Sequence, residues 1–286
     1  METITLNTKA KMPMIGLGTY LNPGKEVKEA VKAALSLGYH HIDTAAVYNN
    51  EKEIGEVLQE FFKSNSIKRE ELFITSKLGI SITITVNKCL YYFLKTSLSN
   101  LQISYLDLYL IHWPGVERLS PNDEQNASLR KESWKALEEL YQSGRVKAIG
   151  VSNYEIKHLK ELLEDCKVKP AVNQVECHPL CYPSELIKFC KDNDIVFESY
   201  SPLGTGKLLN DPKVLNIAEK HKKKASQVLI RWAFQHNLPT VPKSKTPERI
   251  RDNINIFDFQ LEQEDMETLN SMNQNRHFCW NPEKVK

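Results

Sequence analysis

Short apolar or β-branched runs alternate with longer amphipathic stretches along almost the whole chain. Each short run has the length of a buried strand, and each stretch that follows has the apolar spacing of a helix that covers a sheet. Strands are expected at residues 14–16, 40–43, 72–76, 106–111, 146–151, 171–175, 196–200 and 239–241, and helices at 25–37, 51–64, 86–100, 131–143, 155–165, 184–193, 213–221 with 225–236, and 247–256. Repeated strand and helix units of this number predict an α/β protein, a (β/α)8 TIM barrel.

The residues before the first barrel strand predict a short N-terminal β-hairpin. Residues 4–6 and 9–13 alternate and turn as two small strands, which would close the bottom of the barrel. We find no linker, low-complexity tract or second core, so we expect residues 1–286 to form one barrel domain.

A doubly wound sheet is the competing architecture, and its dinucleotide-binding form needs a G-x-G-x-x-G turn after an early strand. Gly16-Leu17-Gly18 is followed by Thr19-Tyr20-Leu21, so the third glycine is missing. Gly204-Thr205-Gly206-Lys207 is followed by Leu208, where a phosphate loop needs Ser or Thr. Neither segment supports the alternative.

Composition and charge exclude several classes of protein. The chain has 286 residues, of which 41% are hydrophobic and 26% charged, and its net charge is only +2. A disordered chain would have fewer apolar residues, and a nucleic-acid-binding protein usually has a larger basic excess. No apolar run is long enough for a membrane span, the start lacks the features of a signal peptide, and the cysteines are thinly spread. We therefore expect a cytoplasmic protein with reduced thiols, no membrane and no nucleic-acid partner.

Polar side chains close several of the predicted strands. In a barrel of this kind the C-terminal strand ends meet at one mouth, where the chemistry takes place, so these side chains should face each other. They are Asp43, Lys77, His112, the pair Ser152 and Asn153, and the pair Gln174 and Glu176.

Four residues from these regions form a chemically sensible set: Asp43, Tyr48, Lys77 and His112. The phenol of Tyr48 is a poor acid at neutral pH, and a neighbouring ammonium such as Lys77 would lower its pKa. A buried lysine needs a carboxylate to remain charged, and Asp43 supplies one. Neutral His112 can orient a carbonyl oxygen. Such a group protonates an oxygen as negative charge develops on it, and it needs no nucleophile.

At this point the sequence resembles the aldo-keto reductases, a family of NADPH-dependent carbonyl reductases with a (β/α)8 fold. The resemblance runs nearly from end to end. The matching segments are GYHHIDTA at 38–45 followed by Tyr48, ITSKL at 74–78, DLYLIHWP at 107–114, IGVSN at 149–153, NQVE at 173–176, SYSPLG at 199–204 and VPKS at 241–244.

The resemblance implies a role for each matching residue. Tyr48 would be the general acid, Lys77 and Asp43 would tune it, and His112 would orient the substrate carbonyl. Ser152, Asn153 and Gln174 would hydrogen-bond the nicotinamide carboxamide, and Tyr200 would stack on its ring. The cofactor-binding set then comprises Gly18, Thr19, Asp43, Ser152, Asn153, Gln174, Tyr200, Ser201, Leu203, Lys243, Ser244, Thr246, Arg249, Asp252 and Asn253.

Charge also favours NADPH over NADH as the cofactor. Three cations and two hydroxyls gather in Lys243-Ser244-Lys245-Thr246 with Arg249, next to a predicted helix start, which suits a phosphate. In the family an acidic residue and an asparagine then meet the adenine, and Asp252 and Asn253 match them, although glutamate is the more familiar acid.

Departures from the family pattern concern the substrate pocket. Gly79 stands where many relatives have a bulky wall residue, while Tyr20 and Trp113 remain as aromatic walls. Residues 80–92 are unusually β-branched and apolar, so their conformation is an open question. The chain ends soon after residues 277–280, without the longer tail of some relatives. A wider and more open pocket is expected.

The segment Cys177-His178-Pro179-Leu180-Cys181 offers zinc-ligand chemistry, but no second pair with zinc-site spacing accompanies it. The sequence therefore predicts no metal site.

The sequence thus predicts a monomeric, NADP-dependent oxidoreductase that reduces aldehydes, and some ketones, to alcohols. Dicarbonyls, aromatic aldehydes, sugars and prostaglandin-type compounds all remain open as substrates. A non-catalytic nicotinamide-binding protein on the same barrel is the alternative. A metal-dependent barrel isomerase or hydrolase would need a carboxylate and histidine cluster at the strand ends.

Overall fold

A computed structural model describes residues 2–79 and 86–286. Eight parallel strands form one sheet in which each strand pairs with the next along the chain. In order they are β3 (Leu17–Gly18), β4 (His41–Asp43), β5 (Phe73–Leu78), β6 (Leu108–Ile111), β7 (Ile149–Ser152), β8 (Val172–Glu176), β9 (Val196–Tyr200) and β10 (Thr240–Val241). This order confirms the expected (β/α)8 architecture.

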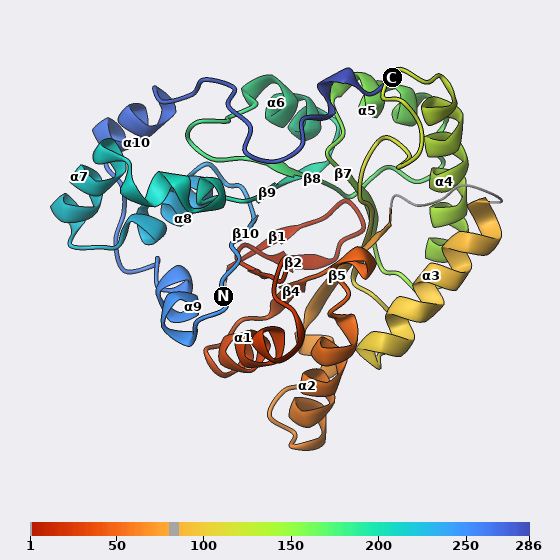
Figure 1. Cartoon of the computed structure of the whole chain (residues 1–286), viewed down its shortest axis with the longest axis horizontal. Coiled ribbons are helices and arrows are strands. Elements are labelled where there is room, and N and C mark those ends of the chain that lie inside the picture. Colours follow the sequence, from red (N-terminus) through yellow and green to blue (C-terminus); the bar gives the residue numbers. More distant parts are fainter. Residues whose placement is uncertain (1, 80–85) are drawn as a thin grey trace.

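Helices surround the strands on the outside of the barrel (Figure 1). They are α1 (Gly24–Ser36), α2 (Glu51–Lys63), α3 (Val86–Leu101), α4 (Gln125–Gln142), α5 (Ile156–Asp165), α6 (Ser184–Asp192), α7 (Pro212–His221), α8 (Ala225–Gln235), α9 (Pro247–Ile254) and α10 (Gln263–Asn270). Four short 3₁₀ segments in the described chain are η1 (Ala46–Tyr48), η2 (Arg69–Glu71), η3 (Gly204–Asn210) and η4 (Pro282–Lys284). No helix in the described ranges is both long and apolar enough to cross a membrane.

The first and last strands join through backbone hydrogen bonds that close the barrel. Gly16 N donates to Thr240 O over 2.9 Å, and Gly18 N donates to Pro242 O over 3.1 Å. A Cβ atom at Gly16 would lie 2.7 Å from His41 Nδ1, and one at Gly18 would lie 2.8 Å from the carbonyl oxygen of Val241. Glycine is therefore required where the two ends of the sheet meet.

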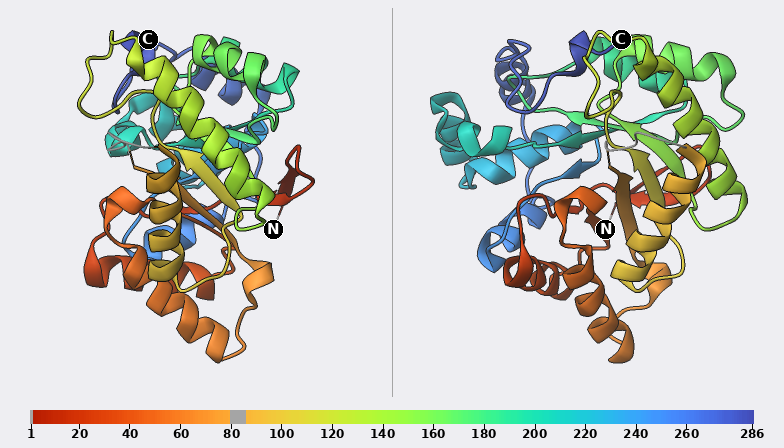
Figure 2. Two further views of the ribbon diagram at one scale, coloured as in Figure 1. Left: turned by 90° about the vertical axis from the view of Figure 1, so that its right-hand side faces the viewer. Right: turned by 45° about the vertical axis from the view of Figure 1, so that its right-hand side comes forward.

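An N-terminal hairpin covers the bottom of the barrel, as expected. It pairs β1 (Thr3–Thr5) with antiparallel β2 (Lys11–Pro13), and Figure 2 shows it standing out at one end of the molecule. Leu6 and Met12 are almost completely buried and pack against side chains from the barrel interior. Those side chains are Phe73, Leu108, Leu110, Ala148, Ala171 and Val172. The hairpin thus shields the lower core from water.

The main core lies between the sheet and the helices. In α1 the buried residues follow the spacing of one helical face, with Val27, Ala30, Val31 and Ala34 all fully buried. Burial of each valine side chain stabilises the fold by roughly 1.5–3 kcal/mol. This rigid frame holds the strand ends, and the side chains on them, in fixed positions.

Several boundaries differ from the predicted ones, most clearly those of β3 and α4. The first barrel strand is 17–18 rather than 14–16, because the earlier residues reach it only through isolated bonds such as the Ile15 to Thr240 bridge. Helix α4 begins at Gln125 rather than 131, since tertiary contacts of Arg130 to the carbonyls of Pro114 and Lys286 secure its first turns. Helix α10 was not predicted. Residues 80–85 lie outside the described chain, and 86–92 belong to α3.

Candidate active site

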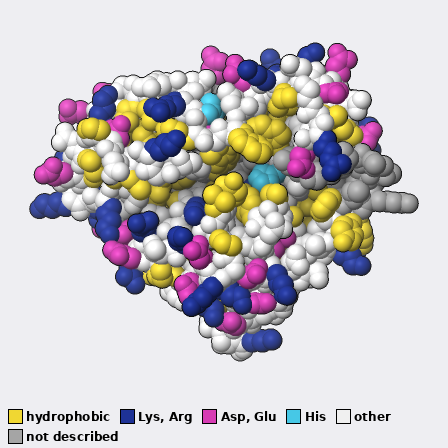
Figure 3. Space-filling view, in the orientation of Figure 1, with side chains coloured by type: hydrophobic (Ala, Val, Ile, Leu, Met, Phe, Trp, Pro, Cys, Tyr) yellow, Lys and Arg dark blue, Asp and Glu magenta, His cyan; other side chains and the backbone are white. Residues whose placement is uncertain are grey.

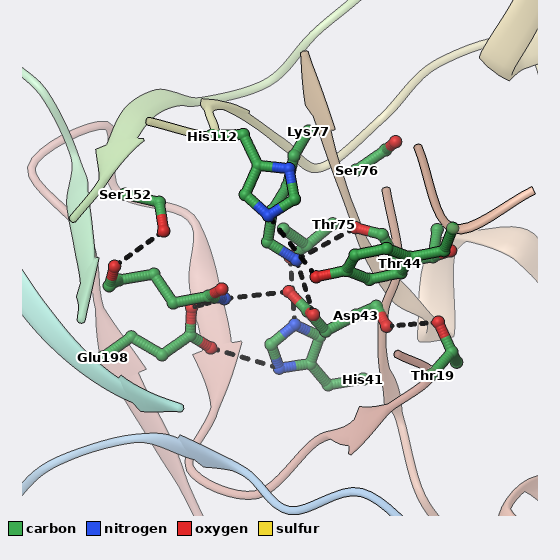
Figure 4. Close-up of polar contacts among 12 residues, drawn as sticks. Thr19, His41, Asp43, Thr44, Thr75, Ser76, Lys77, His112, Ser152 and Glu198 are labelled. Atoms are coloured by element: carbon green, nitrogen blue, oxygen red, sulfur yellow. Dashed lines mark hydrogen bonds and ion pairs between the residues drawn. The ribbon is translucent and has the colours of Figure 1, made fainter. Parts of the chain in front are cut away.

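Asp43 and Lys77 meet at the C-terminal ends of β4 and β5. Lys77 Nζ donates to Asp43 Oδ1 over 2.6 Å and to the carbonyl oxygen of Thr44 over 3.0 Å (Figure 4). The lysine is completely buried. Burial alone lowers its pKa, but Asp43 and the neighbouring Tyr48 and Glu198 more than offset this, so the pKa of Lys77 lies above its ordinary value. The ammonium therefore remains charged under the barrel mouth.

Tyr48 and His112 lie above this ion pair. Tyr48 ends η1, and His112 directly follows β6. The Tyr48 hydroxyl lies 3.5 Å from His112 Nε2, and Lys77 Nζ lies 5.2 Å from the centre of the phenol ring. Both side chains are only partly buried, so an oxygen atom entering from the mouth can reach both of them. The structure thus brings together all four residues that the sequence predicted to act as one set.

The pKa of Tyr48 depends on two opposing effects. Burial raises it to about 12, and the charge of Lys77 opposes this without reversing it. Lys77 thus acts in the predicted direction, but desolvation of the phenolate outweighs the effect of the ammonium. For His112, burial and then Lys77 lower the pKa to about 3, which agrees with the expected neutral imidazole.

A second buried carboxyl lies beneath the ion pair, and sequence reasoning missed it. Gln174 Nε2 donates both to Asp43 Oδ2 and to Glu198 Oε2, each over 2.8 Å. Burial and then Asp43 raise the pKa of Glu198 to about 8. Glu198 lies inside β9 between apolar and hydroxyl residues, and a charged residue in the middle of a predicted buried strand was the available signal.

The residues expected to hold a nicotinamide ring form one connected network. Ser152 Oγ donates to the carbonyl oxygen of Gln174 over 2.8 Å, and the Tyr200 hydroxyl donates to Asn153 Oδ1 over 2.8 Å. Asn153 Nδ2 in turn donates to the carbonyl oxygen of His112 over 3.1 Å. These bonds tie β7, β8 and β9 to the loop after β6. The ring of Tyr200 and the amide of Asn153 therefore belong to one hydrogen-bonded network that includes the backbone of His112.

The predicted cofactor residues nearest to this network come from strand ends. Gly18 ends β3, and Thr19 Oγ1 donates to the carbonyl oxygen of Asp43 over 2.9 Å. Ser201 follows β9 with a positive φ of 50°, and Leu203 directly precedes η3. All four residues therefore lie at or just beyond the C-terminal ends of strands.

The predicted phosphate and adenine residues surround the start of α9. Lys243, Thr246 and Arg249 are exposed, Ser244 and Asn253 are buried, and Asp252 accepts from Lys224 Nζ over 2.7 Å. In the described parts of the chain neither Lys243 nor Arg249 has an ion-pair partner within 4.0 Å, whereas Lys245 Nζ lies 3.0 Å from Glu26. Two unpaired cations therefore lie beside a helix N-terminus.

Aromatic side chains surround the mouth above Tyr48. The ring centres of Tyr20 and Tyr48 are 5.1 Å apart, and Trp113 meets Trp280 edge to face at 6.0 Å. Trp280 was missed because it lies in the tail, outside any predicted element. At Gly79 an added Cβ would have no neighbour within 4 Å in the described chain, which agrees with a wider wall there. Figure 3 shows hydrophobic side chains around a hollow in the middle of this face.

The comparisons with known proteins agree with this geometry. The model of the Aldo/keto reductase family matches residues 14–274. The chain belongs to the aldo/keto reductase family. It is 43% identical to the glyoxal reductase of Bacillus subtilis (strain 168) over 99% of this chain and 97% of that protein, and 45% identical to aldose reductase B of Dictyostelium discoideum over 94% and 91%. The solved aldose reductase of Schistosoma japonicum has a TM-score of 0.89 at 40% identity, covering 98% of this chain and 94% of that one.

As an aldo/keto reductase, this protein is an oxidoreductase, and its family reduces small carbonyl compounds with a nicotinamide cofactor. The side chains fit such a group. The amides of Asn153 and Gln174 suit a carboxamide, and the unpaired cations Lys243 and Arg249 suit a phosphate.

Proposed function

We propose that this aldo/keto reductase reduces aldehydes, and some ketones, to alcohols with NADPH. The observation that carries the proposal is the pair formed by Tyr48 and His112, whose hydroxyl and Nε2 atoms lie 3.5 Å apart above the buried ion pair of Lys77 and Asp43. Two hydrogen-bond donors at this spacing suit one carbonyl oxygen that gains negative charge during reduction.

Tyr48 donates the proton in this proposal. Its raised pKa keeps the phenol protonated at neutral pH, and the alkoxide that forms from a carbonyl is a much stronger base than phenolate. The phenolate that remains lies next to the ammonium of Lys77, which stabilises it. Asp43 keeps that ammonium charged. No nucleophilic side chain takes part.

His112 orients the carbonyl. Its imidazole is neutral across the physiological pH range, so it can donate one hydrogen bond without adding a second charge near Lys77. The hydrogen bond from Asn153 Nδ2 to the backbone carbonyl of His112 fixes this residue relative to the nicotinamide network. One hydrogen bond thereby links the residue that would orient the substrate to a residue that would bind the cofactor.

The cofactor residues share two tasks. Ser152, Asn153 and Gln174, which hydrogen bonds link to each other and to Tyr200, would hold the carboxamide, and Tyr200 would support the ring. When bound, NADPH supplies the hydride. Lys243, Ser244, Thr246 and Arg249 would hold the phosphate that distinguishes NADPH from NADH, because unpaired cations near a helix N-terminus favour that added charge.

The open mouth favours small and aromatic aldehydes. Tyr20, Trp113 and Trp280 offer flat apolar walls, and Gly79 leaves one side without a bulky residue. The similarity to a glyoxal reductase makes small dicarbonyls the first class to examine.

The test is a spectrophotometric assay of the purified protein with NADPH and a panel of glyoxal, methylglyoxal, benzaldehyde and a sugar aldehyde, with NADH in parallel. The proposal expects aldehyde-dependent NADPH oxidation that exceeds NADH oxidation. Tight NADPH binding without turnover on any aldehyde would instead support the non-catalytic alternative. Equal rates with both cofactors would contradict the phosphate assignment alone.

A further inference from the structure

Three ligand-type side chains from separate parts of the chain meet at a second place. Glu176 ends β8, Cys181 lies in the loop before α6, and His277 lies in the tail after α10. One donor atom from each lies within 4.8 Å of the other two. Because His277 is 96 residues away from Cys181, spacing along the sequence could not reveal the group.

We propose that Glu176, Cys181 and His277 bind one divalent transition-metal ion, with Zn²⁺ as the best match. A thiolate, an imidazole and a carboxylate are the ligand types that zinc uses, and a hard ion such as Mg²⁺ or Ca²⁺ would not select a thiolate. The proposal revises the prediction of no metal site, which rested on the missing second ligand pair. The tail supplies that missing ligand.

Two separations between the ligand atoms are close to those of tetrahedral coordination. Zinc bonds of about 2.3 Å to sulfur and about 2.0–2.1 Å to nitrogen and oxygen, at the tetrahedral angle, separate sulfur from nitrogen by about 3.6 Å and nitrogen from oxygen by about 3.3 Å. In the structure Cys181 Sγ lies 3.7 Å from His277 Nδ1, which lies 3.1 Å from Glu176 Oε2. Cys181 Sγ also lies 3.7 Å from His277 Nε2, so the imidazole must turn before Nδ1 and the thiolate can bind the same ion.

The carboxylate of Glu176 is already oriented by its neighbours. Its Oε1 atom accepts from Phe278 N over 2.8 Å and interacts with His178 Nε2 over 3.1 Å, while Oε2 accepts from Cys279 N over 3.2 Å. Hydrogen bonds of this kind hold the side chains that bind metals in proteins in the required orientation. The ion would take the place of the proton between His277 Nδ1 and Glu176 Oε2, and of the thiol proton of Cys181.

Access to the site is through the tail. Glu176 and Cys181 are buried, whereas the His277 side chain remains 17% exposed. The tail is attached at Leu180 as well as at Glu176, since Gln274 N and Arg276 N both donate to the carbonyl oxygen of Leu180. The partly exposed imidazole lies where water can reach the ion as a fourth ligand.

Co²⁺ titration of the reduced, chelator-treated protein tests the proposal, because tetrahedral Co²⁺ has strong visible bands and a thiolate adds a near-ultraviolet charge-transfer band. We expect one ion per chain with both features, displaced by Zn²⁺. Cys181→Ser should abolish the charge-transfer band, and His277→Gln should weaken binding about tenfold or more. Cys166→Ser and His40→Gln are matched controls at other sites and should leave the spectrum unchanged.

Two outcomes would overturn the proposal. One is the lack of any tetrahedral spectrum at Co²⁺ concentrations well above that of the protein. The other is a charge-transfer band that survives in Cys181→Ser, which would place the thiolate elsewhere. Should the buried Cys181→Ser variant fold poorly, His277→Gln in the tail still decides the matter, because unchanged Co²⁺ affinity in that variant would also contradict the site.

Discussion

The ammonium nitrogen of Lys77 lies 2.6 Å from a carboxylate oxygen of Asp43, and both side chains are almost fully removed from water. A buried charge that loses its partner is far more costly than an exposed one. The pair therefore influences both the stability of the barrel and the chemistry at its mouth.

Asp43→Asn should lower the free energy of unfolding by about 3–5 kcal/mol, because it leaves the buried Lys77 without its counter-charge. Urea denaturation followed by circular dichroism measures this change. The control is Asp192→Asn, which breaks an exposed pair with Lys188 and should cost no more than about 1 kcal/mol. Equal costs for the two variants would show that the buried pair has no special role.

His112→Gln should keep most of the aldehyde reduction rate, within about tenfold, while His112→Phe should lose roughly 10²–10³-fold. The reason is that His112 is neutral and acts through one hydrogen bond, which a glutamine amide can also donate. Steady-state rates with a saturating aldehyde measure the difference. A glutamine variant as slow as the phenylalanine variant would indicate that His112 transfers a proton.

Lys243→Met and Arg249→Met should each weaken NADPH binding about tenfold or more and leave NADH binding unchanged, because each removes one charge-assisted contact to the phosphate. Quenching of tryptophan fluorescence measures both affinities. Lys245→Met is the control, since that ammonium is paired with Glu26. If the affinity for NADH fell by the same factor, Lys243 and Arg249 would not bind the phosphate specific to NADPH.

Glu198→Gln should change the pH dependence of stability. The pKa of Glu198 is about 8 in the fold against 4.5 for the free group, so between these values the folded state binds more protons than the unfolded state. The free energy of unfolding of the wild type therefore falls as pH rises through this window. The glutamine variant has no titrating carboxyl and avoids this loss. Its side-chain oxygen can still accept the hydrogen bond from Gln174.

We expect the variant to gain about 2 kcal/mol relative to wild type between pH 6 and pH 9. Thermal or urea unfolding at the two pH values provides the measurement, and Glu164→Gln, at an exposed position of α5, serves as the control. A constant difference between wild type and Glu198→Gln would mean that this carboxyl does not titrate in the window.

Much of the barrel and its mouth could be predicted because strand ends are marked in the sequence. Asp43, Lys77 and His112 each terminate an apolar run, and parallel strands bring such ends together whatever the details of packing. Tyr48 lies five residues beyond Asp43, where the short η1 turn returns it to the same mouth. Local pattern and barrel topology together were sufficient for this set.

Other features depend on contacts that no local pattern contains. Trp280 and His277 reach the mouth only because the tail folds back over the ends of β8 and β9. The pKa of Tyr48 could not be predicted in direction, because the loss of water around the phenol competes with the nearby ammonium and only the packed structure shows which effect is larger. The bounds of the two-residue strand β3 also depend on its pairing with neighbouring strands, which the composition of the segment does not show.

The most direct test of the proposed chemistry is the single-turnover rate of NADPH oxidation by an aldehyde in Tyr48→Phe, measured together with its NADPH affinity. We predict a rate lower by about 10²–10⁴-fold and an affinity close to that of wild type, because the variant lacks only the hydroxyl that donates the proton. A Tyr48→Phe enzyme that folds, binds NADPH and oxidises it at the wild-type rate would contradict the assignment of Tyr48 as the general acid.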